Sequence, residues 1–328
     1  MERRCPRRTG CPRERANARR VSTAGNGLFA KAIALPVADV LGQLPSLEHV
    51  ISVTRNTAAA MTTVGRYAAP QRAGAPLVVE TGRMCLRVHP ESLGMTLFAE
   101  PVAAHRKPVS LHFFDRDGIV LHETYLTSID EDSKLDMLIS GRAGGEAEAR
   151  SGAAPAPGSW TWQPQLLSPL AGLHADAGFH VDSILGDNGI ARRASLPVWG
   201  EGSAWQIDVS DLVGLFTLLK EAWMPLGIAV GNLGLVQYHQ GEIDGVKRSG
   251  NLVQISSKHS NVTISLDDIE EAWITHVEAG GRREHILELY DWRCHCIAQF
   301  KDADDGDENL SIFWRQILST LPRLRAVS

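Results

Sequence analysis

The sequence has no apolar run long enough for a membrane-spanning helix. Its longest apolar stretch, near residues 28 to 44, is interrupted by Lys31, Pro36 and Asp39, whereas a span needs about 20 apolar residues in a row. The arginine-rich start of the chain is not followed by an apolar segment either, which argues against a secretory or twin-arginine signal. No membrane span and a cytoplasmic location are therefore expected.

Cysteines are few: the chain has five, and two of them, Cys5 and Cys11, lie near the N-terminus. An odd number spread over 328 residues is not a disulfide framework. The triplet Cys294-His295-Cys296 could suggest a metal site. However, alternate residues of a strand point to opposite faces, and no second Cys or His pair follows at zinc-finger spacing. We expect these to be ordinary strand residues in a reducing cytosol.

Recognisable catalytic motifs are absent as well. The chain has no Walker A sequence, no GxGxxG, no GxSxG and no DxDxDG calcium loop, so nucleotide, hydrolase and calcium functions have no specific support. The twelve histidines include no HxxxH or HExxH pair, which leaves a zinc site made of protein side chains alone without support. Acid–base catalysis by carboxylates stays open, because the pairing of Asp and Glu in space is invisible in a sequence.

Positive charge is confined to the start of the chain. Residues 1–20 hold eight Arg and two Glu, a local charge of +6, which leaves −11 for the rest of a chain whose total is −5. An acidic body argues against nucleic acid as the main partner, since phosphate binding needs clustered Lys and Arg. We expect residues 1–25 to be a disordered basic arm, with a mitochondrial-type presequence as the alternative.

The rest of the chain divides into two halves around a linker. Residues 141–158 have no apolar period and are rich in Gly, Ala and Pro, which is typical of a flexible connection. We place the first repeat at 26–140, the linker at 141–165 and the second repeat at 166–328.

Related patterns occur on the two sides of this linker. VTRN at 53–56 is followed by SLHFFDRDGIVLHETYL, and VGN at 230–232 is followed by ILELYDWRCHCIAQF. Asn56 and Asp115 are 59 residues apart, as are Asn232 and Asp291. This equal spacing predicts a tandem structural repeat.

Each copy ends in a strand, a turn and another strand, which predicts an antiparallel hairpin. Apolar residues at helical spacing follow Asp208, as far as Trp223, and Asp307, as far as Leu321. The sequence therefore predicts an α+β fold with two antiparallel β-sheet halves, each with packed helices.

His180 is a candidate ligand for heme. Heme iron can take a single imidazole, while the propionates need Arg or Lys and the macrocycle needs an apolar slot. His180 lies in AGFHVDSILGDNGIARRASL, where Arg192 and Arg193 follow about three turns later if the stretch is helical. These residues alone favour the commoner outcome, a core or surface histidine and two solvated arginines.

Longer segments carry a more specific signal. Four segments resemble segments of one protein family. In the first half, VISVTRN resembles the family segment VMALTRN, and SLHFFDRDGIVLHETYL resembles SLQFFDxxGxAxHKxYL. In the second half, GIAVGNLGLVQYHQGEI resembles VFVGNxGCIQIHxGxV, and HILELYD resembles TSLELFD. These are segments of the HemS/ChuS-like hemin-utilisation family, and the likeness covers roughly residues 40 to 328. Members of that family are tandem-repeat proteins that bind heme between their halves. The resemblance implies the same fold, with heme (iron protoporphyrin IX) as the cofactor.

The resemblance also implies a set of heme-binding residues. In the family, a helix of the form HDFFxLLxxFGVSRxQAL begins with the histidine that binds the iron, and HVDSILGDNGIAR resembles it with one residue fewer. His180 is then the axial metal ligand and Arg192 the arginine near a propionate. Arg87, in MCLRVHP, matches an arginine over the opposite heme face and is the candidate catalytic residue. Gln299, in IAQF, matches a glutamine at the heme edge.

Several positions depart from the family pattern. Phe179 precedes the axial histidine where Thr or Val is usual, and Gly186 and Gly189 each lower helix propensity by roughly 1 kcal/mol. In the second half, residues 273–277 replace a Lys-bearing segment, Lys301 stands where a tyrosine is often found, and Ala229 replaces an aromatic residue. Two alternatives follow: a divergent heme binder with a looser pocket, or a scaffold that has kept the fold and lost heme ligation.

The function implied by the resemblance is intracellular heme binding, for heme trafficking or for degradation that releases iron. In degradation, Arg87 would order water or oxygen on the open heme face, and electrons would come from an external reductant because no flavin or nicotinamide motif is visible. The expected partners are heme and a heme-uptake transporter or a heme acceptor protein. A carrier and an oxygenase need the same axial histidine and open face, so both stay open.

Overall fold

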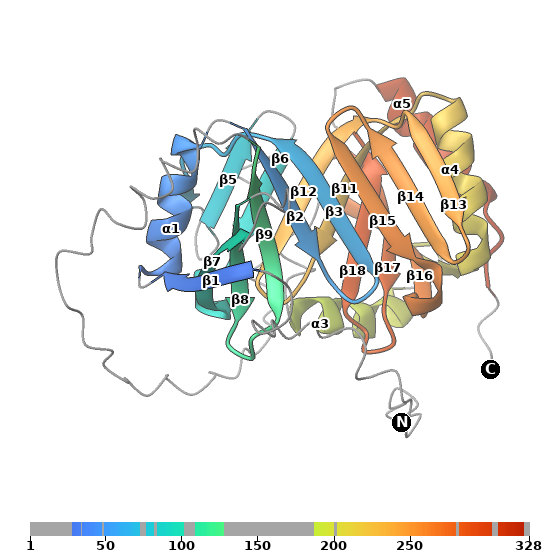
Figure 1. Ribbon diagram of the computed structural model, residues 1–328. Helices are drawn as coiled ribbons and strands as arrows, with labels where there is room; N and C mark the ends of the chain where they lie inside the picture. The colour runs from blue at the N-terminus through green and yellow to red at the C-terminus, as the bar shows by residue number, and fades with distance from the viewer. Residues whose placement is uncertain are drawn as a thin grey trace.

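The computed structural model describes residues 28–33, 35–47, 49–72, 77–81, 84–101, 109–127, 187–199, 202–279, 282–303 and 308–324. This part of the chain forms two nine-stranded antiparallel sheets with a few helices (Figure 1). The predicted combination of helices with antiparallel sheets is confirmed. The arm expected at 1–25, the linker expected at 141–165 and His180 lie outside the described residues.

The first sheet combines strands from both halves of the chain. Its order is β1 (Leu28–Ile33), β7 (Leu93–Pro101), β8 (Ser110–Asp115), β9 (Val120–Leu126), β2 (Val50–Arg55), β3 (Ala59–Gly65), β15 (Ser260–Ser265), β14 (Leu252–Ser257) and β13 (Gly245–Ser249). The two halves meet where β3 pairs with β15, with Ala59 opposite Ile264.

The second sheet repeats this arrangement with the halves exchanged. Its order is β10 (Ala204–Ile207), β16 (Glu271–Ala279), β17 (Arg282–Tyr290), β18 (Cys296–Asp302), β11 (Pro225–Gly231), β12 (Leu235–Glu242), β6 (Met84–Val88), β5 (Leu77–Thr81) and β4 (Gln71–Arg72). Each sheet thus takes six strands from one half and three from the other. This differs from the expected arrangement of one sheet for each half, because each half completes the sheet of the other.

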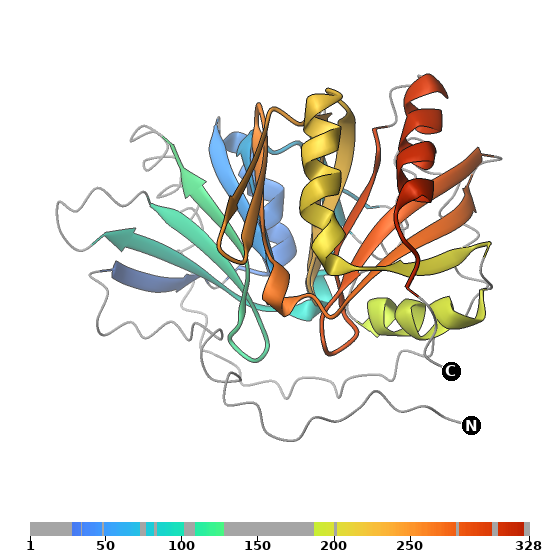
Figure 2. The ribbon, with the colours of Figure 1, turned by 90° about the vertical axis from the view of Figure 1, so that its right-hand side faces the viewer.

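Two apolar cores each join residues of both sheets. In one, α1 (Val37–Gln43) packs with Leu111, Phe113 and Leu235. The other contains α4 (Leu212–Glu221) and α5 (Glu308–Thr320), which lie side by side in Figure 2. Here the ring of Phe216 lies 4.9 Å from that of Phe300 on β18. Within the described ranges, no helix combines the length and hydropathy needed to span a bilayer.

The helix predicted after Asp208 is present but ends earlier than its apolar pattern. Asp208 caps a short 3₁₀ turn by accepting from the Ser210 N–H at 2.8 Å, and α4 follows from Leu212. Trp223 was expected on the buried side of this helix. Instead it lies beyond the last turn in a left-handed conformation (φ +54°) and is 70% exposed, because a left-handed residue ends the helix.

A buried polar network connects the two sheets between the apolar cores. Thr54 Oγ1 on β2 donates to Gln237 Oε1 on β12 at 2.6 Å, and Gln237 Nε2 donates to Thr63 at 2.8 Å. His122 on β9 lies 2.9 Å from both Thr54 Oγ1 and the Tyr67 hydroxyl. All five side chains are buried, so the sheets meet here through hydrogen bonds rather than through apolar contact.

The two asparagines of the 59-residue spacing bind the halves to each other. Asn56 Nδ2 donates to the carbonyls of Gly231 and Ile297 at 2.7 and 2.8 Å. Asn232 Nδ2 donates to the carbonyls of Arg55 and Leu121, both at 2.9 Å. Each amide reaches backbone of the opposite half, which explains why asparagine recurs at the end of both strands.

The two aspartates of the same spacing close the hairpin turns. Asp115 Oδ1 accepts from the backbone N–H of Asp117 and of Ile119. Asp291 Oδ1 accepts in the same way from Arg293 and His295. The carboxylate therefore replaces backbone acceptors inside a tight turn.

Cys294 occupies the left-handed position of its turn, and we expect Cys294→Gly to raise the free energy of unfolding by about 1 kcal/mol. Its φ is +67°, and the first hairpin has Gly118 with φ +79° at the same place. Urea denaturation of the variant measures the gain. Gly118→Cys is the matched control and should lose a similar amount, since only open space surrounds a side chain there. A loss of stability in Cys294→Gly would contradict the assignment of strain.

Candidate functional site

The predicted site residues of the described part lie on one face of the second sheet. Directly opposite residues on neighbouring antiparallel strands point to the same side. The register runs through such pairs in series: Trp273 with Glu288, Glu288 with Gln299, Gln299 with Ala229, Ala229 with Tyr238, and Tyr238 with Cys85. Arg87 follows Cys85 by two residues on β6 and therefore shares its side. We call this side the α3 face, because α3 (Asp187–Ser195) packs on it at the lower edge of Figure 1.

Arg192 of α3 is bound to a buried carboxylate of β17. Its Nε donates to Glu288 Oε2 at 2.7 Å and its Nη2 to Oε1 at 2.5 Å. The hydroxyls of Thr275 and Tyr290 also donate to Glu288, and the ring of Trp199 lies 5.0 Å from the guanidinium carbon. Glu288 is fully buried and Arg192 is 7% exposed. The guanidinium of Arg192, which was expected near a heme propionate, is thus hydrogen-bonded to a carboxylate of the protein itself.

This cluster shifts the proton affinities of its members. Burial alone would raise the pKa of Glu288, but the charge and hydrogen bonds of Arg192, with the hydroxyls of Thr275 and Tyr290, lower it. Burial alone would lower the pKa of Arg192, whereas Glu288 raises it. Burial, reinforced by the charge of Glu288, raises the pKa of Tyr290 and of Cys296 well above their ordinary values. The pair is therefore charged, and the tyrosine and thiol beside it are neutral.

Gln299 carries an amide with no hydrogen-bond partner in the described part of the chain. Its side chain is fully buried, and neither Nε2 nor Oε1 has a partner. Its cross-strand neighbour on one side is Ala229, which has nothing beyond Cβ to offer. Because buried polar groups are nearly always hydrogen-bonded, this amide has both a donor and an acceptor left for a polar partner outside the described residues.

Two cations other than Arg192 belong to the same face. Arg87 is half-buried on β6, opposite Val236. Lys301 follows Gln299 by two residues on β18, and its side chain is only 3% exposed. Its Nζ lies 3.7 Å from Glu284 Oε1.

The structure therefore brings Arg87, Arg192 and Gln299 to one face, and His180 lies outside the described residues. Sequence reasoning missed Glu288 as the partner of Arg192, and it noted Lys301 only as a departure from the family. The alternation of β17 and β18 could have placed both residues on this face, but it could not show which partners they meet. Among the described residues, no group of three or more His, Cys, Asp or Glu could hold a metal ion.

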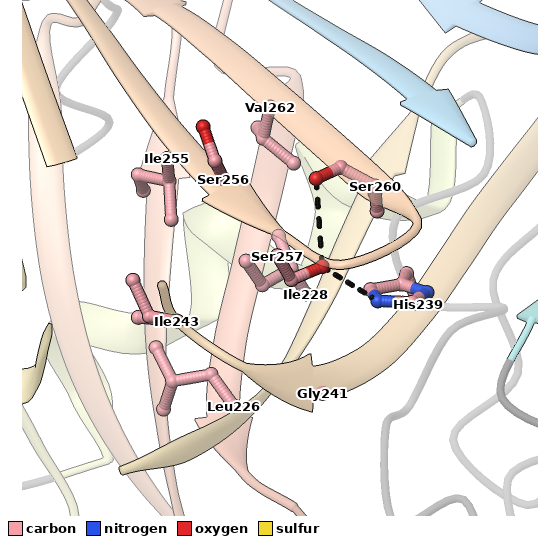
Figure 3. A pocket seen from close by; sticks show the side chains of 10 residues that line it. All are labelled: Leu226, Ile228, His239, Gly241, Ile243, Ile255, Ser256, Ser257, Ser260 and Val262. Atoms are coloured by element: carbon pink, nitrogen blue, oxygen red, sulfur yellow. Dashed lines mark hydrogen bonds between the residues drawn. The ribbon is translucent and has the colours of Figure 1, made fainter. Parts of the chain in front are cut away.

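A histidine–serine pair elsewhere lines a small cavity (Figure 3). Ser257 Oγ lies 2.9 Å from His239 Nε2 and donates to the Ser260 carbonyl at 3.4 Å. The cavity measures about 10 Å³ and is walled by apolar side chains such as Ile228 and Ile255. It has room for about one water molecule, so this pair has no space for a substrate.

A larger hollow of about 550 Å³ lies near the start of α1. It is lined by Ile33, Leu35, Pro36, Val37, Ala38, Pro90, Glu91, Leu93, Gly94, Met95 and Thr96. None of these described residues is a cation or a histidine, so the hollow lacks the groups that a carboxylate-bearing metal cofactor needs.

Comparisons with known proteins agree with this architecture. Hemin transport protein HemS of Yersinia enterocolitica is 25% identical over 292 residues, which cover 86% of this chain and 83% of the relative. Hemin transport protein HmuS of Yersinia pestis is 25% identical over 273 residues, covering 80% and 77%.

Solved structures share the fold. ChuS, a heme oxygenase of E. coli, superposes with a TM-score of 0.71 at 19% identity, covering 89% of this chain and 88% of its own. Apo-PhuS, a heme-binding protein from Pseudomonas aeruginosa, gives 0.69 at 19% identity, covering 90% and 87%. The model of the haemin-degrading HemS/ChuX domain matches residues 15–141 and 189–321, well over half of the chain. The resemblance seen in the sequence is confirmed, and this protein belongs to the HemS/ChuX family of haemin-degrading domains.

Proposed function

We propose that this protein binds heme on the α3 face, either to carry it to an acceptor or to take part in its degradation. The observation that carries the proposal is the fully buried amide of Gln299, which has no partner in the described part of the chain. It lies on the same face as the half-buried Arg87 and the buried ammonium of Lys301. A heme offers carboxylates for such groups and a macrocycle for the apolar and aromatic surface beside them. The names of the relatives, which are hemin transport proteins, support the same ligand.

In this proposal each residue has a distinct role. His180 supplies the axial imidazole, and Arg192 holds α3, which follows His180 in the chain, against the sheet through Glu288. Gln299 binds at the heme edge. Arg87 would order water or oxygen on the open face of the heme, while the surrounding protein would exclude bulk water.

The bound group would supply the iron and the porphyrin carbon at which oxygen chemistry takes place. Degradation would also require an external reductant. The delivery partner, a heme-uptake transporter or an acceptor protein, and a location in the cytoplasm are part of the same proposal. In the described part of the chain, Cys85, Cys294 and Cys296 form no disulfide, which fits a reducing compartment.

We also infer that the chain is a tandem repeat, with units at 26–140 and 166–328. The family model matches two segments, and the two sheets share one strand order with the halves exchanged. Because each half completes the other's sheet, we expect the halves to fold together rather than as separate domains.

Hemin titration of the purified protein tests the ligand and its axial residue. Wild type is expected to give a saturable Soret shift, and His180→Ala to lose that shift or weaken binding by at least about tenfold, since the imidazole is the iron ligand. His259→Ala is the matched control and should behave as wild type, because His259 is exposed in the turn between β14 and β15 of the first sheet. An unchanged spectrum and affinity in His180→Ala would remove this residue from the ligand role. No binding by wild type would favour a scaffold that has lost the ligand.

A reductant then separates the two outcomes for bound heme. Loss of the Soret band with release of iron indicates degradation. A stable band that moves to apomyoglobin when that acceptor is added indicates a carrier.

A further inference from the structure

The large hollow beside α1 borders a threonine hydroxyl that has no hydrogen-bond partner in the described part of the chain. Thr96 lies on β7 and lines the hollow, and only 1% of its surface is exposed. Its Oγ1 is buried and makes no hydrogen bond with the described residues. Because buried polar groups are nearly always hydrogen-bonded, this hydroxyl lowers stability unless a further polar group reaches it.

The neighbouring strands do not supply that group. Thr96 pairs with Ile33 on β1 and with Phe113 on β8, and directly opposite residues of antiparallel strands point to the same side. Both neighbours have hydrocarbon side chains. Rotation about the Cα–Cβ bond of a threonine exchanges its methyl and hydroxyl groups, so the hydroxyl can turn towards the hollow. The hollow is therefore the direction from which a polar partner can come.

This hollow has the size and the lining of a small-molecule pocket. It measures about 550 Å³, within the range of about 300–1,000 Å³ of ligand pockets. It lies where β1 ends and the chain turns into α1, at the left of Figure 1. Apolar residues dominate its wall, and Met95 is 40% exposed beside a bulge of β7 at Gly94. A methionine adapts to the shape of a bound molecule, and bulges are frequent next to active sites.

The wall also limits the charge of a ligand. Among the described residues that line the hollow, Glu91 is the one ionisable side chain, and it is exposed. An acid would be repelled by this carboxylate and would find no cation in the wall. A neutral molecule with an apolar body and a single hydroxyl or carbonyl group matches both the lining and Thr96.

We propose that this hollow binds a small, neutral, mainly apolar molecule that carries one hydrogen-bonding group, and that Thr96 Oγ1 pairs with this group. The site goes beyond the proposed heme function, because it is formed by β1, β7 and α1, whereas heme is proposed to bind the second sheet. An unpaired hydroxyl that lowers the stability of the free protein then has a use in the bound state.

The test compares 2-naphthol with naphthalene, two neutral compounds at pH 7 that differ by one hydroxyl, by equilibrium dialysis. Wild type should bind 2-naphthol about fivefold more tightly, because naphthalene cannot make the hydrogen bond to Thr96. Thr96→Val should bind the two compounds equally, and Thr96→Ser should keep the preference. Thr63→Val is the matched control and should also keep it, since Thr63 is a buried threonine whose hydroxyl is bound to Gln237, away from the hollow.

Urea denaturation without ligand tests whether the hydroxyl of Thr96 is unpaired. Thr96→Val should raise the urea midpoint, because a methyl group replaces a buried hydroxyl that has no partner. Thr63→Val should lower the midpoint, because the amide of Gln237 loses its acceptor. A lower midpoint in Thr96→Val would show that the hydroxyl is satisfied in the free protein, and the inference would then fail.

Ala38→Trp tests the place of binding. Ala38 is half-buried on α1 in the wall of the hollow, so an indole there should fill the space and weaken the binding of both compounds by at least about tenfold. Unchanged affinities in this variant, or a preference for 2-naphthol that survives in Thr96→Val, would overturn the inference. So would a wild type that binds neither compound, including a dimer in which a second copy of the chain covers the hollow. If Ala38→Trp does not fold, the preference in Thr96→Val decides alone.

Discussion

Arg192→Met is expected to lower the free energy of unfolding by about 3–5 kcal/mol. Arg192 and Glu288 form a doubly hydrogen-bonded pair with side-chain exposures of 7% and 0%. Removing the guanidinium leaves a carboxylate buried without its counter-charge, because Thr275 and Tyr290 supply hydrogen bonds but no positive charge. Urea denaturation at pH 7.5 measures the loss.

The neighbouring arginine provides a matched control. Arg193 pairs with Glu271, where the side chains are 23% and 19% exposed. Water reaches this pair in part, so Arg193→Met should cost clearly less stability than Arg192→Met. The double variant Arg192→Met/Glu288→Gln should recover a large part of the lost stability, since the uncompensated charge is gone. A double variant as unstable as Arg192→Met alone would show that lost packing of the arginine, and not the charge, causes the effect.

The second large effect is a loss of stability of about 3 kcal/mol between pH 6.5 and pH 4, caused by His122. Burial, partly offset by the charge of Glu123, lowers the pKa of this histidine from 6.5 to about 4. In that pH range the unfolded chain takes up a proton that the folded chain excludes, so acid favours unfolding. The contribution is complete above pH 6.5 and is lost as the pH falls towards 4. Its size follows from about 1.4 kcal/mol for each pKa unit.

His122→Gln is expected to flatten this part of the pH profile, although the variant starts from a lower stability because the contacts to Thr54 and Tyr67 change. The quantity to compare is the slope of the unfolding free energy between pH 6.5 and pH 4. His259→Gln, at an exposed histidine, should keep the wild-type slope. The profile retains the slope contributed by His285, whose pKa is also lowered to about 4 by burial and by the nearby charges of His276 and Arg315, so the slope is reduced in His122→Gln and not abolished. Equal slopes in wild type and His122→Gln would contradict the prediction.

Local features of the fold could be predicted from the sequence because their causes are local. The hairpin turns follow from Asp115 and Asp291, whose carboxylates accept from backbone two and four residues ahead. The helices α4 and α5 follow from the spacing of their apolar residues. The left-handed end of α4 at Trp223 could not be predicted in this way. Apolar spacing does not distinguish a residue in the last turn of a helix from one just beyond that turn.

The exchange of strands between the sheets was decided by tertiary structure. The alternating pattern of β6 fits any partner that offers an apolar face, since the period of a strand shows which side is buried and not which strand lies next to it. Its pairing with β12 places Arg87 on the α3 face. The candidate site therefore contains a residue from each half only because of this pairing.

For the site itself, the sequence by itself determined the family and the residues to inspect: Arg87, His180, Arg192 and Gln299. Only the tertiary structure decided what those in the described part meet. Arg192 finds Glu288, 96 residues away, and Gln299 is buried with its amide unpaired. Lys301 joins these site residues because the structure buries its side chain on the same face as Gln299. A sequence specifies which charges a strand carries, but the energy of each charge depends on its solvation and on its neighbours in space, which exist only once the sheets have formed.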